Sequence, residues 1–177
     1  MVRAIMHGCN GHMGQVITGL IKADEGIELV AGIDKYTGIA NDYPVFESLE
    51  KCDVEADVII DFSNAAAADA LLTYCEEKKM PVVLCTTGLS EEQLAKIPEA
   101  AKKTAVLKSA NMSLGINLLM KLLKEATKVL APAGYDMEIV EKHHNQKLDA
   151  PSGTAIALAD SMNEAMDEAY HYVYDRS

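Results

Sequence analysis

The sequence predicts an α/β fold: a Rossmann-like parallel sheet domain followed by the beginning of an α+β substrate or oligomerisation domain. Short apolar runs rich in β-branched residues alternate with segments of helical periodicity, a pattern typical of parallel β-α-β units. The first such strand leads directly into a glycine-rich turn that opens a helix. A second strand-to-helix connection, ending at Thr154, carries basic residues beside a helix start.

Composition narrows the function classes. The chain has 177 residues, enough to bury a core in one domain or one and a fraction. Its formal net charge of −11 argues against nucleic acid or an anionic membrane as partner. No apolar run could span a bilayer, the N-terminus does not read as a signal peptide, and the four cysteines show no C-x-x-C pairing. We therefore expect a cytoplasmic, soluble protein.

The glycine-rich turn follows a predicted strand at Val2–Met6 and reads H-G-C-N-G-H-M-G up to Gly14. An apolar helical stripe comes next, and a second strand at Ile27–Ile33 ends at Asp34, twenty residues after Gly14. In this context glycines let the backbone approach a pyrophosphate at the helix N-terminus, while the acidic residue accepts hydrogen bonds from the ribose. The pattern therefore predicts a dinucleotide site.

Other interpretations of these residues exist. Asn10-Gly11 could form a hairpin turn, although the helical period that follows is wrong for a second hairpin strand. Asp34 could be a simple turn residue. Asp34 would repel a 2′-phosphate whereas Lys35 could attract one, so the pair predicts use of NADH with some tolerance of NADPH.

Further strands are predicted at residues 56–62, 81–85 and 104–108, separated by a helix that Asn64 caps and by a short helix that Pro98 interrupts. Ser90 and Gln93 form a capping box for that short helix. Ligands of parallel sheets lie beyond the carboxyl ends of the strands. We therefore expect residues 8–13, Asp34, 61–63, 86–88 and 109–112 to line one edge of the sheet. The expected cofactor contacts are Gly8, Cys9, Asn10, Gly11, His12, Met13, Asp34, Lys35, Cys85, Thr86, Thr87, Ser109, Ala110, Asn111 and Met112.

A leucine-rich helix is predicted at Ser113–Leu130, and its apolar residues cover more than one face. Such coverage predicts burial between two layers. We place the domain boundary at its start, which gives a dinucleotide-binding domain at 1–112 and a substrate-binding or oligomerisation domain at 113–177.

The second motif follows a predicted strand at Asp136–Val140 and runs from Glu141 to Thr154 as E-K-H-H-N-Q-K-L-D-A-P-S-G-T. Ser152 is a good N-cap for a helix that extends to Ala169, so the amides of the first turn lack intrahelical partners and can bind a carboxylate. Two imidazoles and an ammonium precede this cradle. The candidate residues are His143, His144, Lys147, Gly153 and Thr154.

Plainer interpretations of this motif remain open. It could be a solvated loop whose basic residues are incidental. His143 and His144 could bind zinc, but neighbouring strand positions point to opposite faces and no cysteine or third histidine lies nearby, so we expect no metal site. Glu141 and Asp149 could orient the basic groups or could serve structure alone.

Taken together, these motifs resemble the dihydrodipicolinate reductase family of the diaminopimelate and lysine pathway. The resemblance runs from Val2 to about Ala169 through G-C-N-G-H-M-G, D-F-S, T-T-G, A-N-M-S-L-G-I-N and H-H-N-Q-K-L-D-A-P-S-G-T. It implies reduction of a cyclic dicarboxylate, 4-hydroxy-tetrahydrodipicolinate, by NADH or NADPH. It also implies that His143 donates and accepts the proton, that Lys147 is a second donor, and that His144, Gly153 and Thr154 hold the substrate.

The chain departs from the family pattern at three points. His12 stands where the family often has arginine, and Cys85 stands where glycine is common before T-T-G. Family members also usually continue beyond the point that matches Ser177, and their tetramer is assembled through the strands that follow.

Two rival functions remain. The chain could be a nucleotide-binding module without turnover, or a dehydrogenase acting on aspartate or homoserine, although the H-H-x-x-K spacing ahead of S-G-T argues against the latter.

Overall fold

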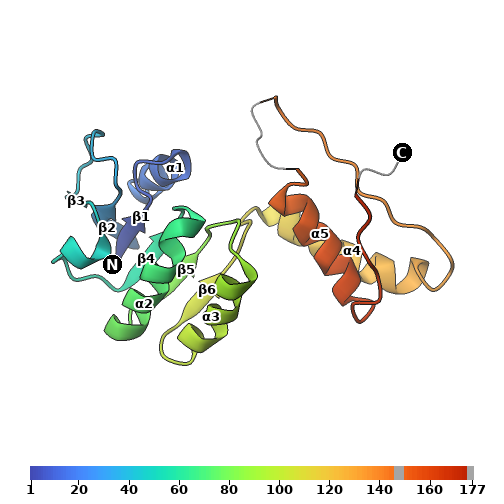
Figure 1. Ribbon diagram of the computed structural model, residues 1–177. Helices are drawn as coiled ribbons and strands as arrows, with labels where there is room; N and C mark the ends of the chain where they lie inside the picture. Colours follow the sequence, from blue (N-terminus) through green and yellow to red (C-terminus); the bar gives the residue numbers. More distant parts are fainter. Residues whose placement is uncertain (146–149, 175–177) are drawn as a thin grey trace. The chain divides into compact units, whose positions relative to one another are not determined.

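The computed structural model describes residues 1–145 and 150–174 and divides the chain into two compact units, Met1–Ser109 and Ala110–Ser177. The first unit, blue to green in Figure 1, contains all the strands of the described chain. These are β1 Val2–His7, β2 Ile27–Ile33, β3 Val45–Phe46, β4 Val58–Asp61, β5 Val82–Leu84 and β6 Val106–Lys108. The predicted boundary after Met112 stays a prediction.

The six strands form one parallel sheet in the order β3-β2-β1-β4-β5-β6. The chain therefore builds outward from β1 through β2 to β3, then returns to the other side of β1 and builds outward again through β4, β5 and β6. This reversal creates a topological switch point between β1 and β4, the place where open parallel sheets bind their ligands. The predicted Rossmann-like fold is confirmed.

Alternate residues of the central strands separate the two faces of the sheet. Ile5 and Ile59 pack with Leu71 of α2 (Ala68–Lys78), and Ala100 of α3 (Glu91–Ala101) joins the same buried cluster. On the other face, Met6 packs with Ile17 of α1 (His12–Ile21). The period of two along each strand thus places α2 and α3 on one face and α1 on the other.

Most predicted elements are found within one to three residues of their expected bounds, and the Ser90–Gln93 capping box is present. The predicted interruption of α3 at Pro98 was wrong, because the helix continues to Ala101 with the proline inside it. Proline removes one backbone hydrogen bond. Ile97 and Ala100, on either side of it, pack against the core and offset that loss.

Short elements without a clear period escaped the sequence-based prediction. They are the two-residue edge strand β3, the 3₁₀ turn η1 (Leu49–Lys51) and the 3₁₀ turn η2 (Ala65–Ala67) that precedes α2. Asn64 is the N-cap residue of η2, but its side chain makes no capping hydrogen bond.

The second unit contains two helices in its described part, α4 (Leu114–Leu130) and α5 (Gly153–Glu164), which pack against each other. Helix α5 ends five residues before the expected Ala169, because Asp167 and Glu168 adopt left-handed backbone conformations. Asn163 secures this end by accepting a hydrogen bond from the Tyr170 amide at 2.9 Å.

Two expectations about the second unit were wrong. Asp136–Val140 is extended but forms no strand, because the described part of this unit offers no neighbouring strand with which its backbone could pair. Helix α4 is not buried between two layers either. Leu114 is 85% exposed and Val129 is 70% exposed, and the main packing of α4 against another helix in the described chain is with α5. Over the same residues, no helix has the length and apolar content that crossing a membrane requires.

Two glycines of α1 offer a matched test of the turn that precedes it. A Cβ atom on Gly14 would lie 2.2 Å from the Gly8 carbonyl oxygen, whereas one on Gly19 would meet nothing within 4 Å. We expect Gly14→Ala to destabilise the first unit by about 3 kcal/mol, since backbone must move to remove the clash. Gly19→Ala should instead stabilise it by roughly 0.5–1 kcal/mol through helix propensity. Urea unfolding followed by circular dichroism measures both, and equal effects would contradict the proposed close approach.

Candidate nucleotide- and substrate-binding sites

The glycine-rich turn is held against two neighbouring strands. The amide of Gly8 donates to the Ile33 carbonyl at 2.8 Å, and Gly8 has a positive φ of 82° that favours glycine. A Cβ atom there would lie 2.6 Å from the Phe62 carbonyl oxygen, so the turn sits directly on the chain that leaves β4. Gly11 is the N-cap residue of α1 and has no side chain with which to cap it. The first-turn amides of α1 are therefore suited to an anion.

Asp34 joins this turn to the loop that follows β2. One carboxylate oxygen accepts from the Asn10 amide at 3.0 Å and the other accepts from the Tyr36 amide at 3.0 Å. Each oxygen keeps a further lone pair that a ribose hydroxyl could use. Lys35 beside it is exposed.

Two amide side chains that the sequence analysis did not single out also contact the glycine-rich turn. Asn41 donates to the side-chain oxygen of Asn10 at 2.8 Å, and Gln15 donates to the Cys9 carbonyl at 2.8 Å. No local pattern marks Asn41, because its role depends on the return of the loop across the turn.

The predicted cofactor-contact residues divide by burial. Cys9 is fully buried in the core and Cys85 is 5% exposed, so contacts with a ligand are open to their backbones rather than to their thiols. His12 and Met13 are exposed at the start of α1, and Thr87 is exposed beyond β5, while Thr86 is buried. Ser109 ends the first unit, whereas Ala110, Asn111 and Met112 belong to the second.

In the second unit, the N-terminus of α5 is built as the sequence predicts. The Ser152 hydroxyl accepts from the Ala155 amide at 3.1 Å, which confirms Ser152 as the N-cap. A Cβ atom on Gly153 would meet nothing within 4 Å, so the space around the first turn is open. Thr154 accepts a hydrogen bond from the Asn111 side chain at 3.0 Å. One expected cofactor residue and one expected substrate residue are thus in direct contact.

Glu141 is the residue that organises this site. Its carboxylate accepts from both the amide and the hydroxyl of Ser152, at 2.8 and 2.5 Å, and lies 3.4 Å from Nδ1 of His143. The histidine side chain is 39% exposed, so it can reach a ligand. Glu141 therefore holds an imidazole beside the open helix N-terminus. His144 is exposed, and Lys147 lies outside the described residues.

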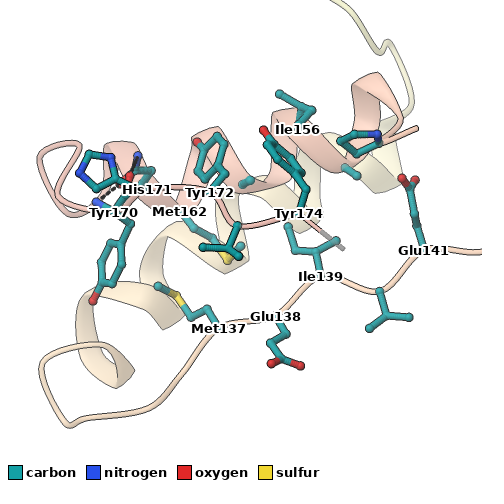
Figure 2. Close-up of a pocket in the computed structure, with 16 residues that line it drawn as sticks. Met137, Glu138, Ile139, Glu141, Ile156, Met162, Tyr170, His171, Tyr172 and Tyr174 are labelled. Atoms are coloured by element: carbon teal, nitrogen blue, oxygen red, sulfur yellow. Dashed lines mark hydrogen bonds between the residues drawn. The ribbon is translucent and has the colours of Figure 1, made fainter. Parts of the chain in front are cut away.

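A hollow of about 1110 Å³ lies beside α5 and shares Glu141 with this site. Figure 2 shows the extended segment Met137–Glu141 and the segment Tyr170–Tyr174, which line the hollow together with residues of α5, and it shows Glu138 pointing away from α5. His143, Gly153 and Thr154 do not line it. Across the described residues, no group of three histidine, cysteine or acidic side chains is placed to hold a metal ion.

The sheet order, the switch point and the glycine turn define the class of Rossmann-like nucleotide-binding proteins. Comparison with known families gives two matches, "Dihydrodipicolinate reductase, N-terminus" over residues 2–112 and "Dihydrodipicolinate reductase, C-terminus" over residues 115–175. The chain therefore belongs to the dihydrodipicolinate reductase family of pyridine-nucleotide oxidoreductases.

Individual relatives agree with this assignment. The chain is 50% identical over 177 residues to the 4-hydroxy-tetrahydrodipicolinate reductase of Clostridium tetani and 52% identical over 176 residues to that of Caldanaerobacter subterraneus subsp. tengcongensis. The first alignment covers 100% of this chain and the second covers 99%. The chain spans 69% of the length of each relative. A solved structure, the dipicolinate-bound dihydrodipicolinate reductase from Paenisporosarcina sp. TG-14, matches all of this chain and 71% of its own, with a TM-score of 0.76 and 30% identity.

The buried thiols of Cys9, Cys75 and Cys85 should be unreactive toward thiol reagents in the folded protein. Burial, with the negative charge of Asp34, raises the pKa of Cys9 to about 11, and burial raises the pKa of Cys75 to about 12 and of Cys85 to about 11. At pH 8 roughly one in a thousand Cys9 thiols or fewer is therefore ionised, and the thiolate is the reactive form. We expect Ellman's reagent to leave these three thiols unmodified in the native protein and to titrate all four in denaturant.

Cys52, which is only half-buried, provides the control for this measurement. Cys52→Ser should remove most of any slow reaction that the native protein shows. Rapid modification of two or more thiols without denaturant would contradict the burial described here.

Proposed function

We propose that this chain is an NADH- or NADPH-dependent reductase that converts 4-hydroxy-tetrahydrodipicolinate to tetrahydrodipicolinate in diaminopimelate and lysine biosynthesis. The observation that carries the proposal is the arrangement of Glu141, which contacts the N-cap Ser152 and His143 at once. A proton donor thus stands beside a helix N-terminus suited to a carboxylate, in a chain whose family reduces with pyridine nucleotides. The proposal includes that the enzyme is a cytoplasmic homotetramer and that its substrate is a dicarboxylate.

Each of the candidate residues around the N-terminus of α5 has a proposed role in this reaction. When bound, the reduced nicotinamide would supply a hydride to an electron-poor C=C–C=N system of the substrate, and negative charge would develop on the substrate. His143 donates a proton to quench that charge, and Glu141, 3.4 Å from its Nδ1 atom, holds the imidazole in place. Lys147 is proposed as the second donor, and the amides of Gly153 and Thr154 would bind a substrate carboxylate.

The test is nucleotide oxidation followed by absorbance, with substrate generated in situ. His143→Asn and Lys147→Ala should each lower turnover by roughly 10²–10⁴-fold, the usual contribution of a general acid, with the NADH dissociation constant changed by less than about twofold. Variants of a histidine and a lysine outside the proposed machinery, His171→Asn and Lys142→Ala, should keep full turnover. Turnover retained in both His143→Asn and Lys147→Ala would remove the assigned roles. NADH binding without turnover in the unsubstituted protein would favour the rival nucleotide-binding module.

Cofactor preference follows from Asp34 and Lys35. The carboxylate of Asp34 faces the loop where the adenosine ribose is expected and would repel a 2′-phosphate, while the exposed Lys35 would attract it. We expect NADH to be preferred and NADPH to be accepted. Lys35→Ala should lower kcat/KM for NADPH by about five- to tenfold, the effect of one partly screened ion pair, and should leave NADH unaffected. Lys22→Ala, an exposed lysine at the end of α1, is the control, and parallel losses with both cofactors would contradict the assignment.

A further inference from the structure

A buried histidine–aspartate pair lies at the switch point of the sheet. His7 is the last residue of β1 and Asp61 the last residue of β4, and the two are in register in adjacent parallel strands. Registered residues of neighbouring strands point to the same face. The Nδ1 atom of His7 lies 2.8 Å from a carboxylate oxygen of Asp61, and the two side chains are 10% and 0% exposed. Gly8, which begins the glycine-rich turn, is the next residue after the histidine.

From this pair a line of polar contacts continues to β5. The Ser63 hydroxyl donates to Asp61 at 2.6 Å, and the same hydroxyl lies 3.4 Å from the Thr86 hydroxyl. The Cys85 amide, one residue before Thr86, donates to the Asp61 carbonyl at 2.9 Å. His7, Asp61, Ser63 and Thr86 therefore form a polar relay across the carboxyl ends of three adjacent strands.

The charged group of the relay is the Asp61 carboxylate. Burial alone would raise the pKa of Asp61, but interactions with the side chains of His7, Ser63 and Thr86 outweigh burial and lower it. The carboxylate therefore stays charged at neutral pH. A buried charge is expensive unless its partners are well placed, so Asp61 constrains the positions of all three.

A purely structural role would not require this location. The cores on both faces of the sheet are built from aliphatic, aromatic and sulfur-containing side chains, whereas the relay lies at the carboxyl ends of the strands, where a ligand is expected. One of its ends adjoins the turn expected to meet the pyrophosphate. The other is Thr86 after β5, across the switch point from Asp34, which is the side where the nicotinamide half of a cofactor is expected when its adenosine ribose lies at Asp34.

We propose that Asp61, Ser63 and His7 are positioning residues that fix Thr86 against the nicotinamide end of the cofactor in register with the glycine-rich turn. This inference rests on the proposed function, because it takes the sheet edge to be the NADH site. Asp61 acts as the fixed acceptor, His7 anchors it to β1, and Ser63 transmits its position to Thr86.

The experiment compares two ligands by calorimetry: NADH, and ADP-ribose, which lacks the nicotinamide. Ser63→Ala removes the link to Thr86 and leaves the buried pair in place. We expect NADH binding to weaken by roughly tenfold, the effect of one lost hydrogen bond, while ADP-ribose binding changes by less than about twofold. His7→Leu should have the same selective effect. His7→Asn should restore binding, because the asparagine amide can occupy the place of Nδ1 and donate to Asp61.

Thr104→Val is the matched control, since it removes a buried hydroxyl before β6 that has no hydrogen-bond partner in the described chain. It should leave both dissociation constants unchanged. Equal weakening of NADH and ADP-ribose in Ser63→Ala would mean a general structural role and overturn the inference, as would unchanged binding of both. If the unsubstituted protein bound neither ligand, the proposed function would fall and this inference with it.

Discussion

The pairing of β1 with β4 is the constraint on which the nucleotide half of this protein depends. Parallel register brings His7 beside Asp61, and the next residue, Gly8, then has to turn over the backbone of Phe62 with no room for a side chain. The turn cannot shift without disturbing β4, because the Phe62 amide donates back to the His7 carbonyl at 3.0 Å. The shape of the anion-binding turn is therefore set by a strand some fifty residues away in the sequence, 61 against 7.

An acidic chain that binds an anionic cofactor and an anionic substrate needs local positive potential that its net charge of −11 does not supply. Backbone amides at helix N-termini provide it without a titrating group, and both α1 and α5 begin with such amides. Two carboxylates of these sites already accept hydrogen bonds from the protein. Asp34 accepts from the amides of Asn10 and Tyr36, and Glu141 accepts from the amide of Ser152. Engaged carboxylates compete less with a ligand anion for the same donors.

Local chemistry made much of this predictable from the sequence. The glycine turn, the capping box at Ser90 and the N-cap at Ser152 each depend on residues within a few positions of one another, and all three are present. The central strands β1, β4 and β5 were also predictable, because each reads as a short, largely apolar run and is mainly buried in the sheet. Asp136–Val140 alternates polar and apolar residues as a strand does, but no strand lies beside it among the described residues, and β structure needs that partner.

The relay from His7 to Thr86 and the contact between Asn111 and Thr154 could not be predicted in the same way. Each joins residues that are 23 to 54 positions apart in a single step, as 7 to 61, 63 to 86 and 111 to 154 show. Strand order had to be known before any of the first set could be placed together. A histidine at the end of an apolar strand reads as incidental until its neighbour across the sheet is identified as an aspartate with no exposure to solvent. The residues proposed to bind the ligand are thus marked by local motifs, whereas the residues proposed to position them are determined by the topology of the sheet.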